Sequence, residues 1–120
     1  MRAFLATLSA DAIPADRLAA DAALLAAESD LLRAWRADAA LFTALDNPNV
    51  DPWRDPGFRA ARAWLLKAGR RLAETPAAGP LGLALKVRYM ALDIRDGRTD
   101  WAKALARHTL ADAVRLALTP

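Results

Sequence analysis

Residues 74–97 read ETPAAGPLGLALKVRYMALDIRDG, the most apolar stretch of the chain. Proline and glycine interrupt it before Leu81, and Asp96-Gly97 closes it. At about 100° per residue, two apolar rows fall on nearly opposite sides of a helix. Leu81, Leu85, Tyr89 and Leu92 form one row, and Leu83, Val87, Met90 and Ile94 form the other. Because a helix that is apolar on two sides belongs between neighbours, we predict that residues 80–95 form the central helix of the fold.

The same stretch also fits the period of a half-buried strand. Leu81, Leu83 and Leu85 alternate with small or charged residues. No other segment of the chain predicts a strand, and a lone strand leaves its backbone donors and acceptors unpaired. We therefore favour the helix, unless a partner chain supplies a second strand.

Apolar residues recur at helical spacing on both sides of this stretch. They predict three further helices, at residues 14–45, 56–73 and 100–118, and Asp55-Pro56 suits the start of the second. A chain of 120 residues that is rich in alanine fits one helical domain. The prediction is an all-α domain over residues 1–120: a compact four-helix bundle or paired helical hairpins, with a short N-terminal arm.

The composition excludes several function classes. Cysteine is absent, so the chain has no disulfide framework, thiolate zinc site or cysteine nucleophile. The one histidine, His108, lies one helical turn from Asp112, and we interpret the two as a surface hydrogen-bonded pair. We expect no enzyme activity, no catalytic residue, no metal and no cofactor. No apolar run approaches the ~18 residues of a membrane span, so we predict a cytoplasmic protein without membrane contact.

In the last predicted helix, an apolar arc is expected to face the core. Leu105, Leu110 and Leu116 belong to this arc, and Asp112 falls to one side of it. The sequence therefore predicts that Leu110 is covered and that Asp112 lies at the border with solvent.

Residues 75–88 carry the pattern T-P-A-x-x-P-x-G-L-A-x-K-x-R. This pattern resembles one found in small uncharacterised all-helical proteins of GC-rich bacterial genomes, some of which lie among prophage genes. Leu110 and Asp112 continue the resemblance more weakly, and those proteins usually have threonine where this chain has Gly79. The resemblance implies a helical fold and a link to phages or mobile elements, and it implies no activity.

Two acidic residues, Asp21 and Glu28, fall on the apolar stripe of the first predicted helix, seven residues apart. Inward carboxylates can act as general acid and base or form half of a metal site. However, the chain has no Glu-x-x-His sequence and no second histidine to complete either site. Arg88 and Arg95 of the central helix have the same spacing of seven. We therefore predict that the two acids form ion pairs with these arginines.

The helix predicted at residues 56–73 is strongly basic. Its candidate anion-binding residues are Arg59, Arg62, Lys67, Arg70 and Arg71. Residues 57–120 carry twelve basic and five acidic side chains, whereas residues 1–56 carry five and nine. A basic helix can follow a phosphate backbone, but these charges spread over about half of its circumference. We expect Arg62 and Arg71 to flank the core-facing side within reach of acids, and the other three to be solvated.

Trp53 is the most unusual apolar residue, because it lies in the proline-rich loop at residues 46–55. An exposed tryptophan is a frequent hot spot for protein binding, but Trp53 can equally fold back as a lid over one end of the bundle. Together with Val50 and Arg54 it forms the predicted partner-binding site. We predict a non-enzymatic protein-interaction or adaptor module whose partner is another protein. Association of the chain with itself into a homo-oligomer is an open alternative. The alternative is a nucleic-acid-binding regulatory protein that uses the basic helix at residues 56–73.

Overall fold

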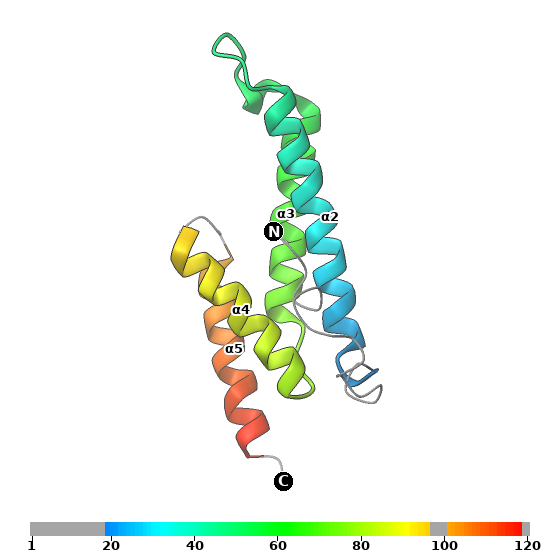
Figure 1. Cartoon of the computed structure of the whole chain (residues 1–120), viewed down its shortest axis with the longest axis vertical. Coiled ribbons are helices and arrows are strands. Elements are labelled where there is room, and N and C mark those ends of the chain that lie inside the picture. Colours follow the sequence, from blue (N-terminus) through cyan, green and yellow to red (C-terminus); the bar gives the residue numbers. More distant parts are fainter. Residues whose placement is uncertain (1–18, 97–100, 119–120) are drawn as a thin grey trace.

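The computed structural model describes residues 19–96 and 101–118 (Figure 1). Its helices are α2 (Ala22–Ala44), α3 (Pro56–Glu74), α4 (Pro80–Asp96) and α5 (Ala102–Ala117), with a short 3-10 helix, η3 (Pro52–Arg54), between α2 and α3. No described residue lies in a strand, so the all-α prediction is confirmed and the strand interpretation of residues 81–89 is wrong. The predicted N-terminal arm and the expected helix starts at residues 14 and 100 lie outside the described residues.

The helices form two antiparallel hairpins (Figure 1). α2 and α3 run side by side along the length of α3, and α4 and α5 form a shorter pair beside the lower half of α3. α3 packs against α2 on one side and against α5 on another. This is the paired-hairpin form of the predicted fold, in which the far end of the α2–α3 hairpin stands clear of α4 and α5.

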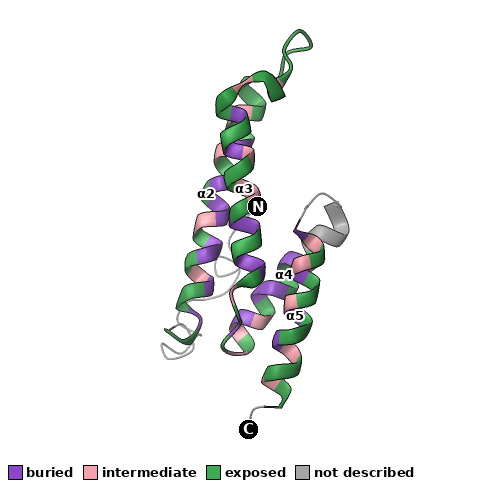
Figure 2. Ribbon diagram, turned by 180° about the vertical axis from the view of Figure 1, so that it is seen from behind, coloured by how far each residue is buried: buried purple, intermediate pink, exposed green. Residues whose placement is uncertain are grey.

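The core lies where the two hairpins meet, and buried residues become sparse toward the loop between α2 and α3 (Figure 2). The buried apolar cluster includes Leu24, Leu31, Ala34, Leu72, Leu85, Tyr89, Trp101 and Leu105. α3 and α5 approach closely at Gly69, where an added Cβ would overlap the indole of Trp101. Apolar burial, the main source of stability, is therefore concentrated in the half of the molecule that contains α4 and α5.

The start of α3 follows the sequence prediction closely. Asp55 accepts a hydrogen bond from the N–H of Phe58 at 2.8 Å, and Pro56 occupies the first helical position. α3 ends where the hydroxyl of Thr75 donates to the carbonyl of Arg71 at 2.6 Å, one residue before Pro76. Proline has no N–H to continue the helix, so the chain turns there toward α4.

Two helices depart from their predicted form. A turn at Asp21 separates α2 from the helical residues 19–20, where the sequence predicted one continuous helix. α5 buries Leu105, Thr109 and Asp112, while Leu110 is 67% exposed. The predictions that Leu110 is covered and that Asp112 borders solvent are therefore wrong. In both helices the cause is an aspartate that binds groups far away in the sequence.

Candidate interaction site at the hairpin tip

The connection between α3 and α4 together with the first residues of α4, residues 75–82, is called the elbow here, and a carboxylate from the start of α2 holds it. Asp21 accepts hydrogen bonds from the N–H groups of Ala78 at 2.7 Å and of Gly82 at 3.0 Å. Gly82 is the third residue of α4, so Asp21 caps α4 from another helix. Gly79, which precedes the first helical residue Pro80, has no side chain to provide this cap. The predicted ion pair of Asp21 is wrong, because its two carboxylate oxygens bind backbone N–H groups.

Glu28 accepts a hydrogen bond from the hydroxyl of Tyr89 at 2.9 Å, and both side chains are buried. Burial first, and then the nearby Glu28 carboxylate, raise the pKa of Tyr89 well above its ordinary value, so the phenol keeps its proton. Arg88 is exposed and forms no ion pair with a described residue, so its predicted pairing is wrong. The side chain of Arg95 lies outside the described residues, and its pairing with Glu28 stays a prediction.

Lys86 is fully buried near the middle of the most apolar stretch. Its Nζ donates to the carbonyl of Ala73 at 2.9 Å and to Oδ2 of Asp112 at 2.6 Å. The Ala73 carbonyl lies in the last turn of α3, so the lysine also satisfies one of the carbonyls that a helix end leaves unpaired. Lys86 therefore joins the end of α3 to α5 through α4.

Asp112 is the centre of these contacts. Besides Lys86, it accepts a hydrogen bond from the N–H of Ala77 at 3.1 Å and from Arg115 at 2.8 Å. Burial alone would raise the pKa of Asp112, but the hydrogen bonds from Lys86, Arg115 and Ala77 outweigh it and hold the pKa below the ordinary 3.8. The predicted surface pair with His108 is therefore wrong. The contacts of Asp21, Lys86 and Asp112 are together called the elbow network. This network is structural, since its buried groups bind one another or the backbone.

At the hairpin tip, the end of the α2–α3 hairpin, polar groups fix the position of a tryptophan. We define the tip as Phe42, Val50, Trp53 and Arg54. The N–H of Trp53 donates to Oδ1 of Asp51 at 3.1 Å, and its carbonyl accepts a hydrogen bond from Arg59 at 3.0 Å. The backbone of Trp53 is thus held on both sides.

The indole of Trp53 is fixed on one side and open on the other. It meets the ring of the buried Phe58 edge-on, with centroids 5.2 Å apart and an interplanar angle of 85°. Trp53 is nevertheless 57% exposed. Phe42, whose ring centre lies 6.4 Å from that of Phe58, is 54% exposed, and Val50 in the same loop as Trp53 is 41% exposed. The two sequence interpretations therefore apply together, because Trp53 covers the end of the hairpin and still presents a large apolar surface.

Arg62 supports this arrangement from α3. Its guanidinium lies 5.3 Å from the ring centre of Phe58 and 5.8 Å from that of Trp53, which is cation–π distance. Its Nε lies 3.0 Å from Oδ1 of Asp38, an ion pair whose angles fall short of a hydrogen bond. The prediction that Arg62 lies within reach of an acid is confirmed. Arg62 contacts the two aromatic rings and Asp38, so its guanidinium is not available to an anion.

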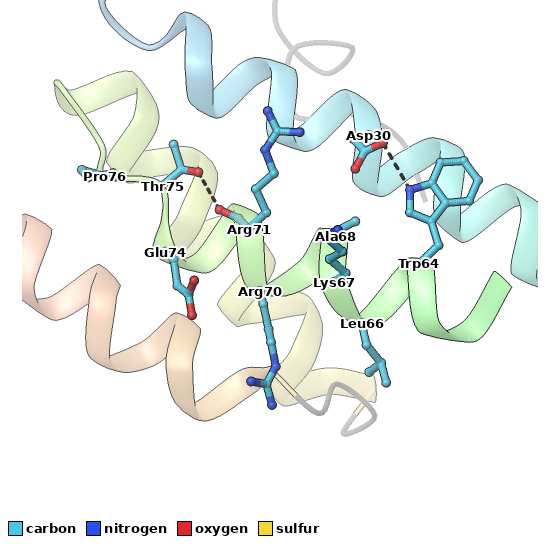
Figure 3. A pocket seen from close by; sticks show the side chains of 10 residues that line it. All are labelled: Asp30, Trp64, Leu66, Lys67, Ala68, Arg70, Arg71, Glu74, Thr75 and Pro76. Carbon is cyan, nitrogen blue, oxygen red and sulfur yellow. Dashed lines mark hydrogen bonds between the residues drawn. The ribbon is translucent and has the colours of Figure 1, made fainter. Parts of the chain in front are cut away.

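The other predicted anion-binding residues do not converge. Arg59 is used by the tip, while Lys67, Arg70 and Arg71 are exposed and form no ion pair with a described residue. Arg71 lines the same pocket as Asp30 and Glu74 and forms no ion pair with either of them. A shallow pocket runs along α3 past Asp30, Trp64 and Glu74, and Arg70 and Arg71 point to different sides of the helix there (Figure 3).

Sequence reasoning missed Lys86 and Asp112 as the residues that fix the fold, and it did not single out Phe42 as part of the tip. A signal for the first two was present, since a charged residue inside the most apolar segment needs a buried partner. Helical periodicity can indicate which face of α2 Phe42 occupies, and its ring centre lies 6.4 Å from that of Phe58 on α3. The period carries no information on whether a neighbouring helix extends far enough to cover that position.

No family model, curated protein or solved structure matches this chain in comparisons with known proteins. Within residues 19–96 and 101–118, no helix has the length and apolar character to cross a bilayer. In the same ranges, no group of three or more histidine, aspartate or glutamate residues is placed to hold a metal ion.

Proposed function

We propose that this protein is a non-enzymatic protein-interaction module that docks a partner protein through the hairpin tip. The observation that carries the proposal is the state of Trp53, which is 57% exposed while its backbone and one ring edge are fixed. A side chain that is rigid before binding loses little conformational entropy on binding, and tryptophan is enriched among interface hot spots.

The position of the tip supports the same function. It stands at the far end of the long hairpin, away from α4 and α5, so a partner can approach it from several sides (Figure 1). Phe42 and Val50 are further exposed apolar side chains at this end of the hairpin, and the exposed Arg54 adds a charge next to Trp53 in the sequence. The partner expected here offers an apolar pocket for the indole with polar groups at its rim.

Quantitative capture from a lysate of the native host tests the proposal. Full-length wild type, Trp53→Ala and Val87→Ala serve as baits, and Val87 is the control because it is an apolar residue of α4 that is 50% exposed. We expect one protein to be retained by wild type and Val87→Ala and lost by Trp53→Ala. With that partner purified, Trp53→Ala should weaken binding by about 30-fold, the effect of a hot-spot residue. Equal retention by all three baits would contradict the proposal.

Nucleic-acid binding is the second candidate, and the exposure of Lys67, Arg70 and Arg71 without ion pairs favours it. Because Arg70 and Arg71 diverge and Glu74 lies among them, we expect no duplex binding tighter than roughly micromolar at physiological salt. Titration of labelled duplex and single-stranded DNA and RNA at two salt concentrations measures this. Submicromolar binding that survives the higher salt would favour the second candidate. The link to phages rests on the resemblance of residues 75–88 alone.

A further inference from the structure

We propose that the outward side of α5 is a second docking surface, which binds an amphipathic helix with acidic residues at one end of its apolar stripe. The surface, called the α5 face, consists of Lys103, Arg107, Leu110, Val114 and Leu118. It shares no residue with the hairpin tip, so this inference is independent of the function proposed above.

The α5 face carries three large apolar side chains that nothing in the described structure covers. Leu110 is 67% exposed, Val114 51% and Leu118 79%. A spacing of four places them in one row along the helix. The end of α5 also extends past the neighbouring ends of α3 and α4, which leaves room beside this row (Figure 1). A contiguous exposed apolar row of this kind is typical of an interaction surface.

The exposure of this row follows from the elbow network. Asp112 points inward, where Lys86, Arg115 and the N–H of Ala77 bind its carboxylate. A helix that turns position 112 toward the core turns positions 110, 114 and 118 away from it. The face is therefore fixed by the packing of α5 and is present before any partner binds.

The charges on α5 select the partner. Asp112 is the only acidic residue of Ala102–Ala117, and its carboxylate is buried. Lys103 and Arg107 are exposed and continue the apolar row toward the start of the helix. The α5 face is thus cationic at one end and apolar at the other. A partner helix complements it with acids opposite Lys103 and Arg107 and apolar residues opposite the row.

Other occupants fit this charge pattern less well. In a parallel pair of two copies, the cations of one α5 would oppose those of the other. An antiparallel pair centred on Val114 would overlap only the last turns and leave both Lys103 and Arg107 without an acid. A helix that lies on an anionic membrane typically has basic residues along the borders of its apolar face, whereas here they lie at one end.

The test uses two labelled helical peptides of about 18 residues, which match the length of α5. Both have a leucine row at helical spacing, and one has three glutamates at one end where the other has three lysines. Fluorescence anisotropy measures their binding to the full chain at low salt. We expect the acidic peptide to bind about tenfold more tightly, since two exposed ion pairs replace two repulsions.

Variants separate charge from the apolar row. Lys103→Glu with Arg107→Glu should reverse the preference between the two peptides, and Val114→Asp should weaken both by about tenfold. Trp53→Ala, at the opposite end of the molecule, should change neither. These positions are exposed, so circular dichroism should find all variants folded.

Three results would overturn the inference. The first is equal affinity for both peptides, or no binding at concentrations on the order of 100 μM. The second is a dimer in sedimentation equilibrium that Val114→Asp abolishes, which would assign the face to a second copy. The third is co-sedimentation with vesicles of anionic phospholipid without binding of the acidic peptide.

Discussion

The elbow and the hairpin tip both join two helices, and they use polar side chains in opposite ways. At the elbow, Asp21, Lys86 and Asp112 are buried, and each binds a backbone group of another segment. Lys86 and Asp112 also bind each other. At the tip, polar groups hold the backbone of Trp53 while its ring stays largely exposed. Removing a buried charge partner is costly, whereas an exposed ring contributes little to stability. The elbow therefore determines the fold, and the tip is the surface left for recognition.

Lys86→Met should give the largest effect. It leaves the Asp112 carboxylate buried without its closest cation, and we expect a loss of about 3 kcal/mol in the free energy of unfolding, measured by urea denaturation. Lys67→Met is the matched control, because Lys67 is exposed on α3, and it should change stability by less than about 0.5 kcal/mol. If the two substitutions changed the free energy of unfolding equally, the buried Lys86 would not stabilise the elbow more than an exposed lysine stabilises α3.

Gly82→Ala tests the elbow without removing a charge. An added Cβ would overlap the carboxylate of Asp21 and displace it from the N–H groups of Ala78 and Gly82. We expect a cost of about 2 kcal/mol, although alanine is the better helix former. In Gly79→Ala the new Cβ would lie 3.8 Å from the same carboxylate, an ordinary contact, so this control should be nearly neutral. A neutral Gly82→Ala would show that Asp21 does not bind as described.

Acid should weaken the elbow. The pKa of Asp112 is lowered in the folded state, so its contribution is complete above the ordinary 3.8 and is lost as the pH falls through the lower folded value. The urea concentration at the unfolding midpoint should therefore decrease once the pH is lowered below about 4. Asp112→Asn should be less stable at neutral pH and should depend less on pH in this range. The same acid dependence in the variant would assign the effect to other carboxylates.

Trp53→Ala should have the smallest effect on stability. It removes one edge-on contact with Phe58 and one cation–π contact, so we expect a loss of about 1 kcal/mol or less in thermal or urea denaturation. A loss above about 3 kcal/mol would identify Trp53 as a core residue, in the range of large-to-small core substitutions. The tip would then be a structural lid, and the comparison with the elbow would fail.

The sequence predicted the local features of this fold well. Helical periodicity gave the four helices, Asp55-Pro56 gave the start of α3, and the position of Arg62 gave an acid within reach. Each of these three features depends on residues close together in the sequence of one helix. The period also marked Asp21 and Glu28 as acids on an apolar stripe, which is where buried partners are required.

The long-range contacts could not be predicted in the same way. Asp21 binds Gly82, 61 residues away, and Lys86 binds Asp112, 26 residues away. A periodic pattern indicates that each charge needs a partner, and it does not indicate which partner. Asp112 also rotates α5 enough to expose Leu110, an effect that no pattern within α5 contains. For the site, the sequence identified Trp53 and Val50, whereas the exposure of Phe42 depends on where α4 and α5 end.

Hydrogen exchange of individual backbone amides tests the central claim most directly. The N–H groups of Ala77 and Ala78 lie outside the helices and that of Gly82 lies in the first turn of α4, so none has a helical partner. If Asp21 and Asp112 hold the elbow, these three amides should exchange as slowly as those in the middle of α4. In Asp21→Ala, the amides of Ala78 and Gly82 should exchange much faster, and Gly79→Ser in that background should restore part of the protection of Gly82. Rapid exchange of all three in the wild type, at the rate of the exposed Asp51 amide in the loop between α2 and α3, would contradict the account.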